Sequence, residues 1–267
     1  MRILITGANG FIGGHLRDHL QQQHQVLAPA RSLLDLTNSN NVEKFFAQTE
    51  VDVVIHCALI GRNNLNGIDD QITIGNLNMF ANLYRNRSKF GRLINMGTGN
   101  EFDTVFDNTN VSEDTLFGRM PVASYGYAKN LIARTVMTTP NMVNMRLFGV
   151  FGNNEGPTRF FKRLKAATQP FHIFQDHVFD FIWVKDLFPI IDMLVSTNYT
   201  HQSINCVYPE KYRLSEMSRM FADIHGIDTD LIMVDSVSDI NFSGNPTRLA
   251  ACNLPLEGLL KGFRSYV

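Results

Sequence analysis

A glycine-rich turn directly after the first apolar run constrains the fold of this chain most strongly. The run Ile3-Leu4-Ile5 is followed by Thr6-Gly7-Ala8-Asn9-Gly10-Phe11-Ile12-Gly13. Small residues between a strand and a helix let the backbone approach a pyrophosphate, and the amides at the helix end face its charge. Three glycines can mark a tight turn in many folds, but this position favours phosphate binding. We expect dinucleotide contacts from Gly7, Asn9, Gly10, Phe11, Ile12 and Gly13.

The first half of the chain alternates short runs rich in Val, Ile and Leu with longer amphipathic stretches. We expect strands at residues 2–6, 25–29, 52–56, 92–96 and 142–147, and helices at 11–22, 41–48, 71–86 and 125–137. This alternation is typical of βαβ units around a parallel sheet. The expected fold class is α/β, with a Rossmann-type doubly wound parallel sheet.

After residue 152 the alternation loosens. Shorter stretches predict helices at 158–167, 184–196, 214–225 and 246–260, and strands at 171–174 and 203–207. We therefore expect a dinucleotide-binding domain over residues 1–152. A small C-terminal α/β substrate lobe would occupy most of residues 153–267, with some segments returning to the main sheet. The polar stretch 100–120 has little periodicity and predicts a long connection.

Charge and cysteine content argue against several classes of protein. The 267 residues include 24 Lys and Arg against 25 Asp and Glu, a balance without the electrostatic footprint of nucleic-acid or membrane binding. The three cysteines form no CxxC pair and the eight histidines show no HExxH spacing, so we expect neither disulfides nor a metal site. A secretory pattern and membrane-length apolar runs are absent from the sequence, which predicts a cytoplasmic protein.

The residues after the second strand bear on which dinucleotide binds. NAD-binding folds often place an acid there, where it would hydrogen-bond the ribose 2′-hydroxyl. This chain has Ala28-Pro29-Ala30-Arg31-Ser32 instead. The guanidinium of Arg31 would suit a 2′-phosphate, which favours NADPH over NADH. The alternative is that Arg31 only lies on the solvated surface.

Two further segments are expected near the cofactor. Asp35 and Leu36, slightly downstream of Arg31, could border the adenine. Cys57, Ala58 and Leu59 follow the third strand, so their backbone would lie at the carboxyl edge of the sheet, where ligands gather. Cys57 itself is expected to be a small structural residue.

Tyr125 and Lys129 lie four residues apart in Ser124-Tyr125-Gly126-Tyr127-Ala128-Lys129. On a helix these side chains share one face, so the ammonium favours the ionised phenol, which can then transfer a proton near neutral pH. Thr98, at the end of the preceding strand, could hydrogen-bond a substrate carbonyl oxygen, while Lys129 would also hold the nicotinamide ribose. A YxxxK pair is common by chance on helices, but its position downstream of the phosphate loop predicts a hydride-transfer enzyme.

On these motifs the chain resembles the extended short-chain dehydrogenase/reductase superfamily, in its nucleotide-sugar epimerase, dehydratase and reductase group. Two more segments are similar to motifs of that group: an RxxNxxG turn in Arg146-Leu147-Phe148-Gly149-Val150-Phe151-Gly152 and a DFxxVxD segment in Asp180-Phe181-Ile182-Trp183-Val184-Lys185-Asp186. The resemblance implies that the C-terminal lobe closes over a nucleoside-diphosphate sugar. The implied substrate contacts are Thr98, Gly99, Tyr125 and Arg159.

The chain departs from the group's pattern at two positions of the substrate lobe. Gly149 stands where the usual residue is asparagine, and Phe179 stands where many members have a nucleotide-contacting arginine. The residues that would hold the diphosphate must therefore differ in detail from those of the group.

The resemblance also bears on the reaction. Dehydratases of this group usually carry Asp-Glu directly after the threonine, whereas Gly99-Asn100 follows Thr98 here. This difference argues against the elimination of water, although the acid Glu101 is close to Thr98 in the sequence. Epimerases retain NAD tightly, which fits poorly with Arg31. The stretch Leu34-Asp35-Leu36-Thr37 is similar to that of 4-keto-6-deoxy sugar reductases.

The sequence thus predicts an NADPH-dependent reductase of a nucleotide-activated 4-keto-6-deoxy sugar, in deoxysugar biosynthesis. An NAD-dependent nucleotide-sugar epimerase or a dehydratase is the alternative, and a non-catalytic dinucleotide-binding sensor is a distant one. The resemblance further implies a homodimer, formed through two helices of each subunit.

Overall fold

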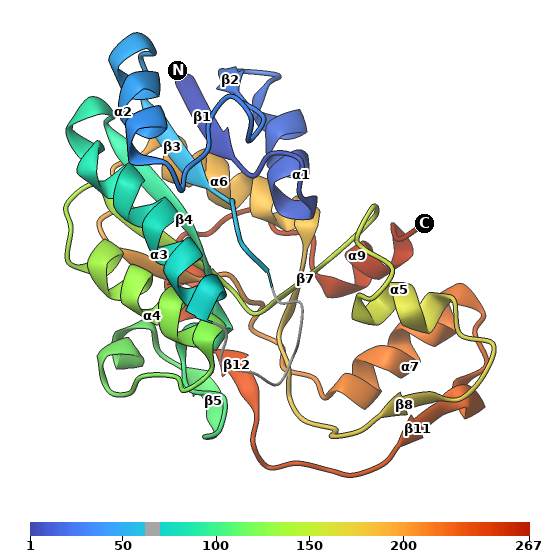
Figure 1. The fold of residues 1–267 in the computed structure, drawn as a ribbon. Coiled ribbons are helices and arrows are strands. Elements are labelled where there is room, and N and C mark those ends of the chain that lie inside the picture. Colours follow the sequence, from blue (N-terminus) through green and yellow to red (C-terminus); the bar gives the residue numbers. More distant parts are fainter. Residues whose placement is uncertain (62–69) are drawn as a thin grey trace. The chain divides into compact units, whose positions relative to one another are not determined.

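The computed structural model describes residues 1–61 and 70–267, which divide into two compact units (Figure 1). Unit 1 comprises Met1–Asp103, Asp114–Arg146 and Ile190–Ile204. Unit 2 comprises Thr104–Glu113, Leu147–Pro189 and Asn205–Val267. Each unit is therefore assembled from segments that lie far apart in the sequence.

A six-stranded sheet with strand order β10-β6-β4-β3-β1-β2 organises unit 1 (Figure 1). Its strands are β1 (Arg2–Thr6), β2 (Gln25–Leu27), β3 (Val53–His56), β4 (Arg92–Thr98), β6 (Met142–Leu147) and β10 (Ser203–Asn205). β1 pairs in parallel with β2 and β3, and β3 with β4. The strand order reverses at β1, because β2 lies on one side of it and β3 on the other. Open α/β sheets bind ligands at the carboxyl edge of such a point.

Helices cover both faces of this sheet (Figure 1). α2 (Ser39–Gln48), α3 (Asp70–Arg85) and α4 (Ser124–Met137) lie on one face, and α1 (Phe11–Leu20) and α6 (Leu187–Ser196) lie on the other. The buried run in β1 explains why both faces need cover, since successive side chains of a strand point to opposite sides. The predicted α/β class and Rossmann-type sheet are confirmed.

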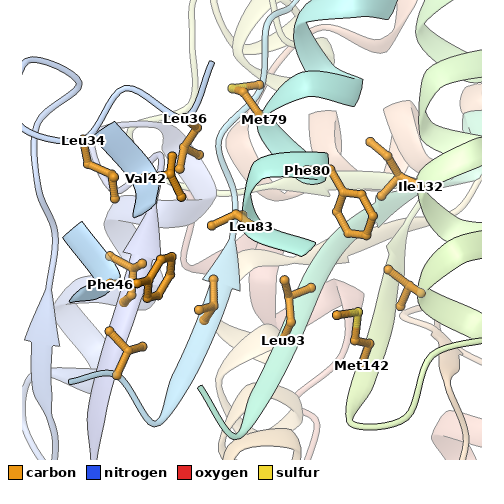
Figure 2. Close-up of a cluster of buried hydrophobic side chains, with 14 residues drawn as sticks. Leu34, Leu36, Val42, Phe46, Met79, Phe80, Leu83, Leu93, Ile132 and Met142 are labelled. Atoms are coloured by element: carbon orange, nitrogen blue, oxygen red, sulfur yellow. The ribbon is translucent and has the colours of Figure 1, made fainter. Parts of the chain in front are cut away.

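The core between the sheet and α2, α3 and α4 is a cluster of buried apolar side chains (Figure 2). Phe46 comes from α2, Phe80 and Leu83 from α3, and Ile132 from α4, while the strands contribute residues such as Leu93. These helices present apolar residues three and four positions apart, which is the pattern that buries one helix face. The cluster fixes α3 and α4 against the strands whose ends carry the candidate site.

The helices and strands predicted for the first half of the chain are present, with ends shifted by one or two residues. The largest differences there are of two residues: β2 ends at Leu27, β4 continues to Thr98, α1 ends at Leu20 and α2 begins at Ser39. The predicted connection at residues 100–120 is only partly irregular. It contains the 3-10 turns η2 (Gly99–Glu101) and η3 (Glu113–Phe117) and the strand β5 (Asn108–Val111).

Unit 2 contains three two-stranded parallel sheets. β5 pairs with β12 (Phe242–Gly244), β7 (Gly149–Phe151) pairs with β9 (Phe181–Trp183), and β8 (Phe171–Ile173) pairs with β11 (Ile232–Val234). Its helices are α5 (Phe160–Lys165), α7 (Leu214–His225), α8 (Thr247–Ala251) and α9 (Leu259–Arg264). A cluster of phenylalanine rings forms its core. The ring centre of Phe161 lies 4.8 Å from that of Phe263 and 5.1 Å from that of Phe221.

Two helix predictions in the second half are wrong in extent. The single helix predicted at residues 246–260 is two short helices, α8 and α9. Pro255 lies between them, where it cannot continue a helix, and Gly258 adopts a φ of +89°, which is outside the helical region. The helix predicted from residue 184 begins at Leu187, after the 3-10 turn η4 (Val184–Asp186). Among the described residues, no helix combines the length and the apolar character needed to cross a membrane.

Candidate active site

The turn between β1 and α1 is built so that only glycine fits at two of its positions. Gly7 has a φ of +69°, and a Cβ there would lie 2.6 Å from the backbone nitrogen of Ala58. A Cβ on Gly13 would lie 2.3 Å from the carbonyl oxygen of Gly7. Gly10 caps α1 without a side-chain hydrogen bond, so no side chain of the cap covers the first amides of the helix. The turn therefore has the open backbone that an anionic group requires.

A cavity of about 260 Å³ lies beside this turn, at the carboxyl ends of β1 and β3. Its wall is formed by the turn after β1, the residues after β2, the segment after β3 and one side chain of α3. The wall residues are Thr6, Gly7, Ala8, Asn9, Gly10, Pro29, Ala30, Arg31, Leu34, Asp35, Leu36, Ala58, Leu59, Ile60 and Met79. The structure thus brings together eight of the residues predicted to bind the cofactor: Gly7, Asn9, Gly10, Arg31, Asp35, Leu36, Ala58 and Leu59.

Four of the other predicted cofactor residues lie next to this wall in sequence but are not among those that line it, and the remaining two, Tyr125 and Lys129, lie on α4. Phe11, Ile12 and Gly13 form the first turn of α1, where Gly13 packs against Gly7. Cys57 follows β3, and burial raises the pKa of its thiol to about 12, against the smaller opposing effect of the Lys129 charge. The thiol is therefore protonated at neutral pH, as a structural cysteine would be.

Sequence reasoning missed Met79 and Ile60 as wall residues. Met79 lies with Leu34 and Leu36 at one end of the apolar cluster, where the three side chains give the cavity an apolar side (Figure 2). Ile60 is held by Asn76 of α3, whose amide accepts a hydrogen bond from the backbone nitrogen of Ile60 at 3.1 Å and donates one to its carbonyl oxygen at 3.0 Å. In the sequence, the sign of this contact was Asn76, a polar residue within the helix predicted at 71–86.

Arg31 and Asp35 form the charged part of the wall. The guanidinium of Arg31 is exposed and lies 3.4 Å from a carboxylate oxygen of Asp35, which makes a weak surface pair. Asp35 accepts hydrogen bonds from the backbone nitrogen of Thr37 at 2.9 Å and from its hydroxyl at 2.7 Å. These bonds, with a smaller contribution from Arg31, lower the pKa of Asp35. The carboxylate is thereby fixed, while Arg31 has room to turn toward an anionic ligand.

Thr98, Tyr125 and Lys129 come from neighbouring elements of unit 1. Thr98 is the last residue of β4 and is nearly buried, and Tyr125 is half-buried in the first turn of α4. Lys129 lies one turn further along α4, and its ammonium donates a hydrogen bond of 2.6 Å to the carbonyl oxygen of Met96 on β4. The lysine is thus anchored two residues before Thr98, on the helix turn that follows Tyr125.

The surroundings of Lys129 link it to the cavity edge. Burial lowers its pKa, and the nearby charge of Glu101 opposes that shift. Nδ1 of His56, the last residue of β3, shares a hydrogen bond of 2.8 Å with the hydroxyl of Thr6. That hydroxyl accepts a hydrogen bond from the backbone nitrogen of Ala58 at 3.3 Å. Burial and then the Lys129 charge lower the pKa of His56 to about 3, so this ring is neutral at physiological pH.

Glu101 is the acid that the sequence left as a possible participant in elimination. Its side chain is fully buried, and its carboxylate pairs with the fully buried Arg146 at 2.7 Å. A carboxylate held in this way is not presented to a ligand. Among the described residues, no group of His, Cys, Asp and Glu is arranged to hold a metal ion.

Arg159, Gly149 and Phe179 belong to unit 2. The guanidinium of Arg159 lies 3.7 Å from Glu155 and donates a hydrogen bond of 2.7 Å to the carbonyl oxygen of Val150. A Cβ on Gly149 would lie 2.5 Å from the ring of Phe181 and 2.7 Å from that of Phe179. The glycine and the phenylalanine that replace the usual polar residues therefore form one packing unit.

Comparisons with known proteins agree with this geometry. Residues 3–206 match the family described as the NAD dependent epimerase/dehydratase family. A GDP-6-deoxy-D-talose 4-dehydrogenase from Aggregatibacter actinomycetemcomitans is 26% identical over 243 residues, which cover 84% of this chain and 80% of that protein. A GDP-L-fucose synthase from Azorhizobium caulinodans is 29% identical over 140 residues, 51% of this chain but only 44% of that enzyme.

Solved structures share the fold along the whole chain. A GDP-mannoheptose C4 reductase from Campylobacter jejuni, with NADP bound, superposes with a TM-score of 0.82 at 18% identity, covering 99% of this chain and 96% of that one. At this level of identity the similarity establishes the fold alone.

Proposed function

Because the chain belongs to the NAD dependent epimerase/dehydratase family, we propose that it is an NADPH-dependent reductase of a nucleotide-activated 4-keto-6-deoxy sugar. The observation that carries the proposal is the anchoring of Lys129 on β4, two residues before Thr98 and one helix turn after Tyr125. These groups stand at the carboxyl edge of the sheet that also carries the dinucleotide cavity. A relative that acts at position 4 of a GDP-sugar, the GDP-6-deoxy-D-talose 4-dehydrogenase, supports the substrate class.

The cavity fits a dinucleotide by its shape and charge. The space that a Cβ on Gly7 or Gly13 would fill is taken by backbone, so the turn lies close to the start of α1 and would hold the pyrophosphate with amides. The apolar side formed by Leu34, Leu36 and Met79 would contact the adenine. Arg31 would hold a 2′-phosphate, which is the reason for preferring NADPH. A bound reduced nicotinamide would supply the hydride that a carbonyl carbon accepts.

The chain's own groups would handle the proton and the substrate oxygen. Thr98 would donate a hydrogen bond to the carbonyl oxygen of the sugar. Tyr125 would transfer its phenolic proton to that oxygen as the carbon becomes tetrahedral, which completes the alcohol. Lys129 would favour the ionised phenolate left behind, through its positive charge one helix turn away.

Two other reactions of the family receive less support. Elimination of water needs an acid and a base beside the sugar, but Gly99 and Asn100 follow Thr98, and Glu101 is buried in its pair with Arg146. Epimerisation needs no net reductant and relies on retained NAD, whereas the first charged residue after β2 is the exposed Arg31 rather than an acid.

The proposal is tested by cofactor binding and turnover. The purified protein is titrated calorimetrically with NADPH and NADH, after its as-isolated nucleotide content is measured. It is then mixed with NADPH and either GDP-4-keto-6-deoxy-D-mannose or dTDP-4-keto-6-deoxy-D-glucose, and the loss of reduced nicotinamide is followed. We expect an empty site, tighter binding of NADPH and oxidation of NADPH with one of the two sugars. Stoichiometric retained NAD and no consumption of reductant would indicate an epimerase instead.

Replacing Arg31 with aspartate should reverse the cofactor preference. A carboxylate in place of the guanidinium repels the 2′-phosphate, so NADPH affinity should fall at least about 10-fold, the effect of losing one charge-assisted contact. NADH affinity should change little, because its ribose carries no phosphate. Calorimetric titration with both dinucleotides measures the two affinities.

Asp35→Asn is the matched control for Arg31. It removes the carboxylate that lies 3.4 Å from Arg31 but leaves the guanidinium in place. The preference for NADPH should then be kept or strengthened. If Arg31→Asp prefers NADPH over NADH as strongly as the wild type does, Arg31 does not bind the 2′-phosphate.

A dimer formed through α3 and α4 is also part of the proposal. The two helices pack side by side on one face of the sheet, and each exposes a large apolar side chain, Ile74 at 56% and Tyr127 at 41% (Figure 1). Ile74→Glu should shift the sedimenting species from a dimer to a monomer of 30.2 kDa, because a charge in an apolar interface is costly. Leu260→Glu, at an exposed position of unit 2, is the control and should stay dimeric. A monomeric wild-type protein would contradict this assembly.

A further inference from the structure

The backbone amide of Thr98 is part of a buried polar network that includes Glu101 and Arg146. One carboxylate oxygen of Glu101 accepts a hydrogen bond from the backbone nitrogen of Thr98 at 2.9 Å. The other oxygen accepts one from Arg146 at 2.7 Å and one from the side-chain amide of Asn144 at 2.8 Å. The side-chain oxygen of Asn144 in turn accepts a hydrogen bond of 2.6 Å from Asn95 on β4.

The backbone around Thr98 is shaped to admit this network. A Cβ on Gly97 would lie 2.6 Å from Glu101 Oε1 and 2.6 Å from the side-chain nitrogen of Asn144, so only glycine leaves room for them. On the other side, Asn130 of α4 donates a hydrogen bond of 2.7 Å to the carbonyl oxygen of Glu101. The guanidinium of Arg146 also lies over the ring of Phe102, with its carbon 4.6 Å from the ring centre. These contacts therefore fix the backbone on both sides of Thr98, at Gly97 before it and at Glu101 and Phe102 after it.

A fully buried ion pair is a poor way to gain stability. Removing two charges from water costs about as much as their attraction returns, and apolar residues of similar volume often serve as well or better. In some proteins such a pair instead specifies one geometry. Here the geometry it specifies is that of the backbone amide of Thr98, whose hydroxyl faces the reaction in the proposed function.

We propose that Glu101 is a positioning residue for Thr98: the buried carboxylate, whose charge Arg146 balances, accepts the hydrogen bond of the Thr98 amide and so fixes the end of β4 where the Thr98 hydroxyl meets the substrate oxygen. This inference rests on the proposed function for the identity of that oxygen. It gives Glu101 a role through the backbone, without contact to the substrate and without proton transfer.

Two double variants separate this role from simple structural support. Both replace Arg146 with methionine and so remove the charge that would be left unpaired. Glu101→Gln/Arg146→Met keeps an amide oxygen that can accept the hydrogen bond from the Thr98 nitrogen. Glu101→Leu/Arg146→Met has a side chain of similar volume that cannot accept it. The hydrogen bond that Asn144 donates to the second oxygen of Glu101 is lost in both proteins, so they differ in whether the Thr98 amide has an acceptor.

The measurements are thermal stability, kcat and KM for NADPH and the keto sugar, and hydrogen exchange of the peptide spanning residues 96–102. We expect a similar KM for NADPH in the two proteins, because neither variant changes the cavity, and a lower melting temperature for the Leu/Met protein, because it leaves the Thr98 amide without an acceptor. The Gln/Met protein should keep kcat within about 3-fold of the wild type, whereas the Leu/Met protein should lose about 10-fold to 100-fold, the scale of a misplaced catalytic group. The amide hydrogens of residues 96–102 should also exchange faster in the Leu/Met protein than in the Gln/Met protein.

Each outcome decides the proposal. Equal kcat and equal exchange in two folded variants would overturn it, since the acceptor would then not matter. If the Leu/Met protein does not fold, a loss of 10-fold or more in the folded Gln/Met protein overturns it as well, because that variant keeps the acceptor. If the wild type reduces neither sugar, the proposed function fails by itself. The exchange comparison then still decides whether Glu101 holds the Thr98 amide.

Discussion

Replacing Tyr125 with phenylalanine should lower kcat by about 10³-fold, the scale of general acid catalysis by one positioned side chain. Only the phenolic oxygen is removed, so the ring can still pack in the first turn of α4 beside Lys129. Affinity for NADPH should stay within about 3-fold, because the cavity wall is unchanged. Single-turnover oxidation of NADPH by the keto sugar measures the first quantity, and calorimetry measures the second.

Tyr127→Phe is the matched control for this result. Tyr127 lies two residues away on the same helix, but its side chain is exposed and no lysine follows it at the same spacing. This variant should keep the wild-type rate. Full activity in Tyr125→Phe, or an equal loss in both variants, would contradict the assignment of Tyr125 as the proton donor.

Gly13→Ala should impair both folding and cofactor binding. The added Cβ would lie 2.3 Å from the carbonyl oxygen of Gly7 and 2.9 Å from its carbonyl carbon, so α1 must move away from the turn. We expect the free energy of unfolding to fall by about 1–3 kcal/mol, the usual cost of overpacking. NADPH affinity should fall by about 10-fold or more, since a displaced helix no longer directs its amides at the pyrophosphate. Urea denaturation and calorimetry give the two values.

Gly14→Ala provides the comparison one residue later in α1. A Cβ there would lie 3.5 Å from the carbonyl oxygen of Ala8, which is ordinary contact. Since alanine is the better helix former, this variant should gain up to about 1 kcal/mol of stability and bind NADPH as the wild type does. Similar behaviour of the two variants would mean that close packing at Gly13 does not shape the site.

The sequence predicted those parts of the site that depend on local geometry. The glycine turn, the arginine after β2 and the pair on α4 can be read from spacing, because a strand-turn-helix unit places them without help from the rest of the chain. Wall residues such as Met79 could not be read in this way. Its contact with the cavity depends on how α3 packs on the sheet, which no spacing in the sequence encodes.

Glu101 illustrates a second limit. From the sequence it was an acid close to Thr98 and therefore a possible participant in elimination. In the fold its partner is Arg146, 45 residues further along the chain. Similarly, the strand β5 was read as part of a connection, because its partner β12 lies in the last part of the chain. Pairings over such distances are decided by the tertiary fold and leave little trace in local pattern.

The packing of Gly149 against Phe179 and Phe181 makes this part of unit 2 sensitive to any side chain at position 149. The ring centres of Phe179 and Phe181 lie 4.8 Å apart, and the pair occupies the volume that a side chain at position 149 would need. Even a methyl group there would meet the ring of Phe181 at 2.5 Å, so a substitution at 149 requires the rings to move. Substitutions at 149 and at these two rings are therefore expected to be energetically coupled rather than additive.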